Sequence, residues 1–257
     1  MKTVPRLGPM KSIIALYVAC GGLRVFEYLV LRTDQSVLGE AFVHKLAGIL
    51  ILALAVWQFA FSWYEIGFAK KAAAKKVLGG LLLGAVSFTA AYGTEFFIQA
   101  SNGNVPTLRV YVTGYIAGGN RGHETGLMFF AFCIIGNIIN VVMEEGVFRG
   151  LFIRLAERRY TFAKAAIFSS VLFGLWHIAA PVRSLLDGEM NAAQAAVAAV
   201  VLVFITGLTG FKFCLLTRLS GSLWMPMADH FFNNTIINLL HVVTASGTDA
   251  LQVVRIS

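Results

Sequence analysis

Charged side chains are scarce in this chain: Asp, Glu, Lys and Arg make up 13% of its 257 residues. Soluble domains carry roughly 25% charged residues. The chain is instead 58% hydrophobic, with a mean hydropathy of +0.74. This composition excludes an ordinary soluble protein and indicates an integral membrane protein. At about 20 apolar residues per crossing, the length allows some six to eight membrane-spanning helices.

Cysteine is also rare. Cys20, Cys133 and Cys214 lie in separate apolar segments without a CxxC spacing, so we expect buried small hydrophobic residues rather than disulfide partners or metal ligands. The chain also lacks an HExxH motif and the GxSG and GxGD motifs of rhomboid-type and presenilin-type proteases. No internal repeat or low-complexity linker divides it, which predicts a single domain over residues 1–257.

Apolar stretches recur along the chain at the length of membrane spans. They predict an all-α fold, a polytopic transmembrane helical bundle with about seven spans. The predicted spans cover residues 11–31, 42–63, 77–98, 126–148, 163–181, 193–216 and 221–243. The polar motifs described below all fall in the last four spans, so we place the catalytic core at about 126–243.

The formal net charge is +8, but the basic residues flank apolar segments and form no single stripe. That pattern argues against a nucleic-acid partner and favours contact with membrane lipid. Basic junctions lie near residues 70–76, 154–164 and 212–218, whereas the loops at 32–41 and 182–192 are mixed in charge. The bias predicts a multi-pass plasma-membrane protein whose N-terminus, with Lys2 and Arg6, is cytoplasmic.

Polar residues form a stripe in the predicted span 126–148. Asn137, Asn140 and Glu144 fall at i, i+3 and i+7, on one face of a helix. Glu145 and Arg149, four residues apart, share a neighbouring face, where an ion pair is natural. A charge at the bilayer centre costs about 2.5–3.5 kcal/mol or more, so an acid there indicates a functional site.

Two later spans carry further polar residues. Phe173 and His177 share one face of a helix, and His230 begins a polar line that continues through Asn234 and Asn238. Counted from the predicted cytoplasmic ends at 1.5 Å per residue, Glu144, His177 and His230 lie at similar depth, roughly 14–21 Å. We therefore expect these side chains to meet inside the bundle.

The motifs Glu144-Glu145-x-x-x-Arg149, Phe173-x-x-x-His177 and His230-x-x-x-Asn234 resemble, in order, the three motifs of the CAAX-protease and bacteriocin-processing (CPBP or Abi) family. These are intramembrane endopeptidases related to type II CAAX prenyl endopeptidase. The resemblance implies hydrolysis of a membrane-associated or lipidated peptide without a cofactor.

The same resemblance implies a role for each matching residue. Glu144, assisted by His177, would activate a water, and His230 and Asn234 would stabilise the oxyanion. Glu145 with Arg149 would hold their helix in register, and Phe173 would shape the pocket. The amides of Asn137, Asn140 and Asn233 are candidates for supporting these groups, or for plain hydrogen bonding between helices.

Other readings of the same residues remain open. Glu144, His177 and His230 could instead be the ligands of a zinc-dependent membrane metalloprotease. A non-catalytic membrane scaffold or immunity protein would keep the fold without the reaction. A transporter is disfavoured because no repeat or pair of broken helices is visible.

Charged residues outside these motifs receive structural roles. Arg24 and Glu27, three residues apart in the first span, are expected to pair with each other. Glu95 is expected near the membrane interface, and His44 receives no role.

Overall fold

The computed structural model of the chain describes residues 8–36, 40–116 and 120–245. Lys2 and Arg6 therefore lie outside the described residues. The helices are α1 (Pro9–Phe26), α2 (Val43–Gln58), α3 (Ala73–Ser101), α4 (Leu127–Glu144), α5 (Ile153–Glu157), α6 (Phe162–Trp176), α7 (Ala179–Leu186), α8 (Ala192–Ser220) and α9 (Trp224–Leu239). Short π-helical or 3-10 stretches follow α1 and α4: η1 (Glu27–Leu31), η2 (Thr33–Gln35) and η3 (Glu145–Phe152).

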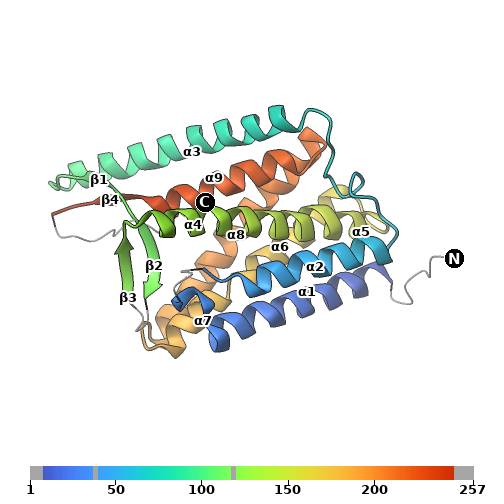
Figure 1. The fold of residues 1–257 in the computed structure, drawn as a ribbon, viewed down its shortest axis with the longest axis horizontal. Coiled ribbons are helices and arrows are strands. Elements are labelled where there is room, and N and C mark those ends of the chain that lie inside the picture. Colours follow the sequence, from blue (N-terminus) through green and yellow to red (C-terminus); the bar gives the residue numbers. More distant parts are fainter. Residues whose placement is uncertain (1–7, 37–39, 117–119, 246–257) are drawn as a thin grey trace.

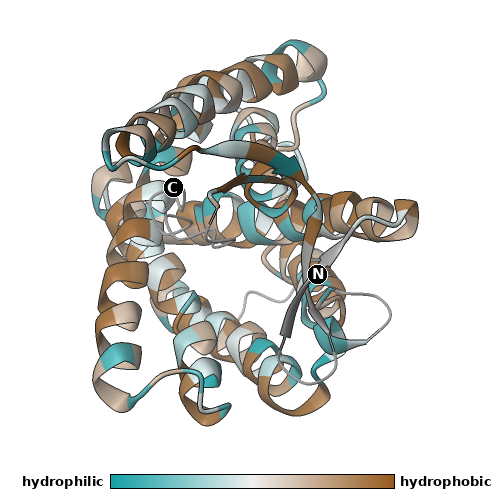
Figure 2. Cartoon of the chain, turned by 90° about the vertical axis from the view of Figure 1, so that its left-hand side faces the viewer, coloured by the Kyte–Doolittle hydropathy of each residue, from teal (hydrophilic) through white to brown (hydrophobic). Residues whose placement is uncertain are grey.

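The predicted helical membrane bundle is confirmed. Among the described residues, five helical stretches are long and apolar enough to cross a membrane: 9–35, 73–101, 127–157, 162–186 and 192–220. α2 and α9, of 16 residues each, occupy the other two predicted spans. Leucines on α2 and valines on α8 are exposed, and much of the helical ribbon is coloured as hydrophobic (Figure 2). This outer surface suits contact with lipid.

The bundle has two distinct ends (Figure 1). The junctions between α2 and α3, α5 and α6, and α8 and α9 gather at one end, which we call the basic end. Arg154 Nε donates to the Glu65 carbonyl oxygen at 2.8 Å, and Arg158 Nη2 to that of Phe59 at 3.2 Å. These bonds tie the α2–α3 loop to α5, so the predicted basic junctions lie together in space.

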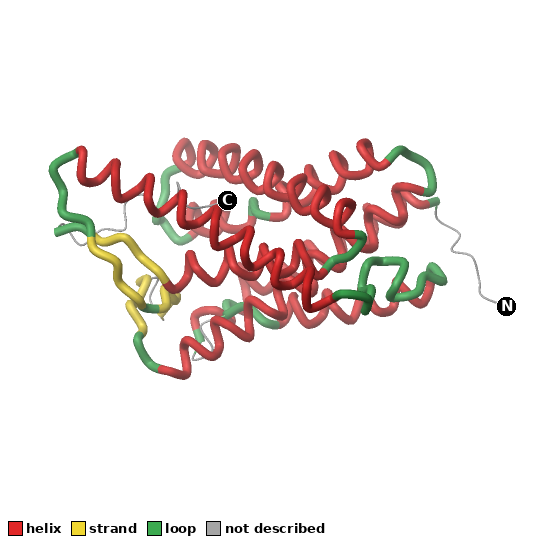
Figure 3. The backbone as a smooth tube through the Cα atoms, turned by 90° about the horizontal axis from the view of Figure 1, so that it is seen from above, coloured by secondary structure: helices red, strands yellow, loops and turns green. Residues whose placement is uncertain are grey.

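Short strands occupy the opposite end, which we call the strand end (Figure 3). β1 (Thr107–Val110) pairs antiparallel with β4 (Leu240–Val243), and β2 (Val112–Ile116) pairs with β3 (Asn120–Glu124). The sequence analysis did not foresee these strands. The predicted span 221–243 was too long, because the backbone becomes extended at Leu240 and its polar groups pair with β1 instead of continuing the helix.

An aromatic cluster packs the bundle between its centre and the basic end. The ring of Phe148 in η3 lies 5.2–6.3 Å from those of Tyr17, Phe152, Phe173 and Trp176. We call these five residues the aromatic core. Phe148 and Phe152 are each 1% exposed, so this part of the bundle is closed.

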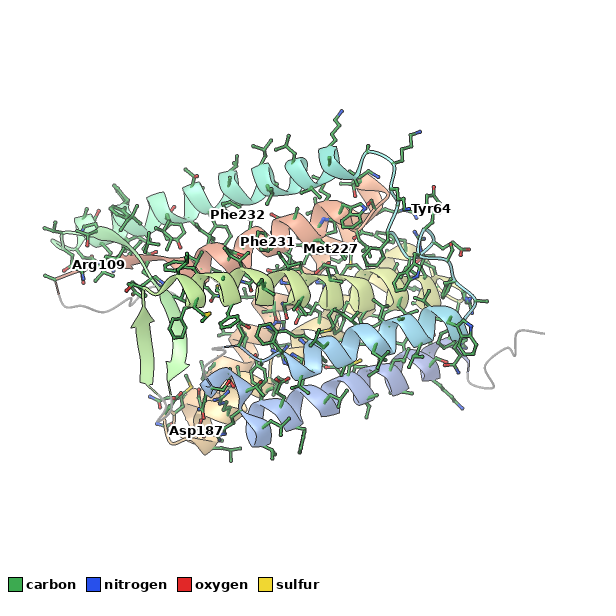
Figure 4. The ribbon with its side chains drawn as sticks, in the orientation of Figure 1. Tyr64, Arg109, Asp187, Met227, Phe231 and Phe232 are labelled. Atoms are coloured by element: carbon green, nitrogen blue, oxygen red, sulfur yellow. The ribbon has the colours of Figure 1, made fainter. Side chains whose placement is uncertain are left out.

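Glycines let α3 approach α9 closely. A Cβ at Gly80 would lie 2.2 Å from the Met225 carbonyl oxygen, and one at Gly84 would lie 2.8 Å from Phe232 Cβ. Small residues at such spacing are typical of helix contacts in membranes, where close backbone approach supplies the packing energy. Phe232 lies on the side of α9 toward α3 and packs on Phe88 at 6.1 Å (Figure 4).

Candidate active site

Polar residues of the predicted spans 126–148, 163–181 and 221–243 line one cavity of about 270 Å³. Its walls come from α1 with η1, from α2 with the residues before it, and from α4, α6 and α9. It is lined by Arg24, Tyr28, Glu40, Lys45, Asn137, Asn140, Glu144, His177, His230, Asn234, Ile237 and Asn238. The expected meeting of Glu144, His177 and His230 is therefore present in the fold.

Glu144 is the most heavily contacted group of the cavity. Its Oε1 accepts from Trp176 Nε1 at 2.8 Å and from Arg24 Nη1 at 3.3 Å. Its Oε2 accepts from Asn140 Nδ2 at 3.2 Å and lies 3.7 Å from His230 Nε2. Glu144 is only 2% exposed, so its carboxylate has lost its hydrogen bonds to water. The contacts with protein groups compensate for that loss.

The expected pair between Arg24 and Glu27 is wrong. Arg24 reaches across the bundle to Glu144, and its guanidinium also lies 4.8 Å from the ring centroids of both Tyr28 and Trp176. Glu27 turns instead to the start of α2, where it accepts from the Val43 backbone N–H at 2.9 Å. Open N–H groups at a helix start attract a carboxylate, and this contact outcompetes the local pair.

Two other residues outside the motifs are buried in the structure. His44, to which no role was assigned, lies with its Nδ1 2.6 Å from Glu27 and its ring against Trp176. It therefore links the α1–α2 corner to the wall of the cavity. Glu95, expected near the membrane interface, is 0% exposed within α3.

Glu145 forms the expected ion pair with Arg149 and also contacts His230. Arg149 Nη1 lies 3.2 Å from Glu145 Oε1, as the i, i+4 spacing predicts. The same carboxylate oxygen lies 2.8 Å from His230 Nδ1. The two adjacent glutamates thus hold opposite nitrogens of one imidazole ring. The helix changes from α to π hydrogen bonding at Glu145, a widened turn often found at functional sites.

His177 ends α6 with a defined tautomer. Its Nδ1 lies 2.8 Å from the Phe173 carbonyl oxygen, which can only accept. The proton of the neutral ring is therefore on Nδ1, and Nε2 carries a lone pair. The Phe173 ring packs edge-on against His177 at 4.9 Å, which restrains the imidazole.

The asparagines divide into those that line the cavity and one that does not. Asn140 donates to Glu144, and Asn137 Nδ2 lies 3.6 Å from Cys133 Sγ. Both line the cavity, as does Asn234. Asn233 is buried but lies outside the lining, and its amide has no hydrogen-bond partner among the described residues.

Residues 126–236 match the family model described as type II CAAX prenyl endopeptidase Rce1-like. This segment belongs to the Rce1-like family. The match contains all three motifs and confirms the resemblance stated from them. It supports a protease of the CAAX-type intramembrane class in general terms. No curated protein and no solved structure gives a significant match to the chain.

The Rce1-like segment does not supply the whole cavity. Arg24, Tyr28, Glu40 and Lys45 lie before it in the chain and contribute the part of the lining that comes from α1, η1 and the start of α2. Sequence reasoning assigned none of them to the site. Arg24 could have been found, because a cation in an apolar span is subject to the same cost that singled out Glu144.

The arrangement of the site gives no support to the alternative of a bound zinc ion. Among the residues that the structure describes, no group of three His, Cys, Asp or Glu side chains is placed to hold a metal. The Arg24 guanidinium, 3.3 Å from the Glu144 carboxylate, would also repel a divalent cation bound there.

Proposed function

We propose that the chain hydrolyses a peptide bond of a membrane-associated or lipidated peptide with a water activated by Glu144 and His177. The observation that supports this most is the shared cavity, which brings an ionisable acid, two imidazoles and Asn234 together inside an apolar bundle. No cofactor is required by this chemistry.

Glu144 is the general base of the proposal. It takes a proton from the water, and the resulting hydroxide attacks the carbonyl carbon of the scissile bond. Arg24 and Trp176 hold Oε1, so the carboxylate keeps one orientation during the transfer. The lone pair on His177 Nε2 gives the water a second acceptor. The proton held by Glu144 then passes to the leaving amine as the carbon–nitrogen bond breaks.

His230 and Asn234 are the proposed oxyanion stabilisers. The Asn234 amide donates through Nδ2, and His230 donates through Nε2 when that nitrogen carries a proton. Glu145 holds the ring through Nδ1, and Arg149 pairs with the same oxygen of Glu145. One such donor is worth about 2.7–4 kcal/mol in acyl-transfer enzymes.

The remaining proposals concern where the protein is located and what surrounds it. We propose the plasma membrane, a cytoplasmic N-terminus and contact with membrane lipid. The gathering of the basic junctions at one end of the bundle supports all three. A nucleic-acid partner is not proposed.

The test is cleavage of a set of fluorogenic peptides, lipidated and unlipidated, by purified protein in lipid nanodiscs. The variants are Glu144→Gln, which removes the base at constant shape, and Glu65→Gln, which changes an exposed glutamate at the basic end. We expect wild type and Glu65→Gln to cleave with or without a chelator, and Glu144→Gln to lose activity. Activity lost on chelation and restored by zinc would favour the metalloprotease reading. Absence of cleavage across the whole set would favour the non-catalytic scaffold.

A further inference from the structure

α8 carries none of the three motifs, yet it lies against α6 and α9, which carry two of them (Figure 1). The structure describes α8 over its whole length, and none of its residues is among those that line the cavity. The approach is close at Gly210, where a Cβ would lie 2.9 Å from Arg149 Nη2 and 3.0 Å from Phe173 Cδ1. Such distances are shorter than ordinary van der Waals contact, so glycine lets the backbone of α8 reach these two motif residues.

One turn further along α8, the side chain of Phe213 stacks on the imidazole of His230. The two ring centroids are 4.7 Å apart, and the ring planes differ by 23°. Phe173 of the aromatic core meets the same imidazole edge-on at 6.1 Å. Aromatic rings attract each other in both geometries. Because Phe213 is 0% exposed and closely packed, its ring restrains the plane of the imidazole.

The plane of the His230 ring decides which groups its two nitrogens reach. Nδ1 lies 2.8 Å from Glu145 Oε1, and Nε2 lies 3.7 Å from Glu144 Oε2. A rotation about the Cβ–Cγ bond would move both nitrogens away from these carboxylates. The Nδ1 contact alone is short enough for a hydrogen bond, because 3.7 Å exceeds hydrogen-bond length. The stacked ring of Phe213 therefore adds a restraint that the polar contacts do not supply.

An ion pair beside Phe213 joins α8 to α9. Lys212 Nζ lies 2.9 Å from Asp229 Oδ2, and Asp229 is the 0% exposed neighbour of His230 in the chain. A buried carboxylate is costly without a cation, so Lys212 is held near Asp229. The Lys212 ammonium also lies 4.9 Å from the Phe213 ring centroid, and the Arg149 guanidinium lies 5.1 Å from it. The ion pair fixes the turn of α8 that carries Phe213, and cations over an aromatic ring stabilise its position further.

We propose that Phe213 is a positioning residue for His230, and that the pair between Lys212 and Asp229 keeps Phe213 against the imidazole. In this role Phe213 holds Nε2 toward the cavity, where the proposed reaction needs a donor to the oxyanion. The effect on cleavage rests on the proposed function, whereas the restraint on the imidazole does not.

NMR of the full chain in detergent micelles, with isotope-labelled histidine, tests the restraint without any cleavage. The ring current of a stacked phenyl group moves the signals of the imidazole protons to lower frequency. The His230 signals are identified by their loss in His230→Gln. Phe213→Leu removes the stacked ring and keeps an apolar side chain. Phe211→Leu is the matched control, because it removes a phenyl group from a partly buried position elsewhere on α8.

We expect the His230 signals to move to higher frequency in Phe213→Leu and to stay in place in Phe211→Leu. Unchanged signals in folded Phe213→Leu would overturn the stacking. If that variant does not fold, Phe213→Met replaces it, because a flexible methionine fills an irregular space.

The ion pair is tested in the same spectra. Lys212→Met is expected to move or broaden the His230 signals, because Asp229 loses its cation. Lys212→Arg keeps the charge and is expected to restore them. Signals of Lys212→Met that match those of wild type would refute the role of the pair.

Cleavage kinetics then test the effect on the reaction. Phe213→Leu is expected to lower kcat by about ten- to a hundredfold with little change in KM, because a misplaced catalytic group slows the chemical step. Phe211→Leu is expected to keep both constants. A wild-type kcat in Phe213→Leu, with the His230 signals moved, would overturn the positioning role. Failure of the proposed reaction is separate, since it appears as absence of cleavage by wild type while the His230 signals still report the stacking.

Discussion

The guanidinium of Arg24 lies 3.3 Å from the carboxylate of Glu144, although 120 positions separate the two residues in the chain. Arg24 belongs to the first helix, and Glu144 lies in the segment that matches the Rce1-like family. The N-terminal helix therefore contributes a charge to the candidate active site and does more than cover the bundle.

Substitution Arg24→Gln is expected to lower kcat by about ten- to a hundredfold, because a hydrogen bond to a charged group is worth about 1.5–3 kcal/mol. Arg24→Lys keeps the charge and is expected to recover part of that loss. Arg32→Gln, which changes an arginine paired at the strand end, is the matched control. Peptide cleavage with kcat and KM measured separately checks this. A kcat for Arg24→Gln equal to that of wild type would contradict a positioning role for Arg24.

Substitution Arg149→Met is expected to destabilise the protein by about 3–5 kcal/mol, because it leaves the buried Glu145 carboxylate without its cation. The control is Arg154→Met in the same region, whose side chain is 41% exposed and whose pair with Glu157 is worth about 0–1 kcal/mol. Equilibrium unfolding in mixed detergent micelles compares the two. Equal stability of the two variants would mean that the pair between Glu145 and Arg149 contributes little.

Substitution Gly80→Ala is expected to destabilise the contact between α3 and α9 by about 1–3 kcal/mol, because the added methyl overpacks a closed interface. Gly93→Ala is the control on the same helix, where a Cβ meets nothing within 4 Å. Alanine is the better helix former, so this change is expected to be neutral or to stabilise by about 0.5–1 kcal/mol. Thermal unfolding of both variants in detergent distinguishes them, and the prediction fails if Gly80→Ala is as stable as Gly93→Ala.

Substitution Asn234→Ala is expected to lower kcat by about a hundred- to a thousandfold if its amide stabilises the oxyanion. Asn137→Ala removes an amide from the same cavity about two helical turns from Glu144 on α4, and we expect only a small change in kcat. Both variants need the same cleavage assay and a check of folding by thermal unfolding. Similar losses in the two would indicate that Asn234 acts as an ordinary lining residue.

Local chemistry made part of the site predictable. Burying a charged glutamate in an apolar span costs free energy, so such a residue indicates a functional site. The fixed rise of a helix places Glu144, His177 and His230 at similar depth. The pair between Glu145 and Arg149 followed from their spacing. The roles assigned to these residues remain predictions, because the geometry places the groups without testing the reaction.

Other features depended on contacts between distant segments. The pairing of β1 with β4 joins residues more than a hundred positions apart, and neither segment is long enough to signal a strand alone. His230 contacts both glutamates where the helix changes to π hydrogen bonding at Glu145, and regular helical spacing does not indicate this change. Asn233 was grouped with the supporting amides by proximity in sequence, yet it does not line the cavity.

The sequence by itself determined that this protein is a helical membrane bundle and which polar residues its membrane spans must bury, because composition and helical period are properties of each segment alone. Only the tertiary structure decided that Arg24 pairs with Glu144 instead of Glu27, and that Phe213 of α8 stacks on His230. A buried charge must find a partner, and among several partners of suitable charge the packing of the helices selects the one within reach.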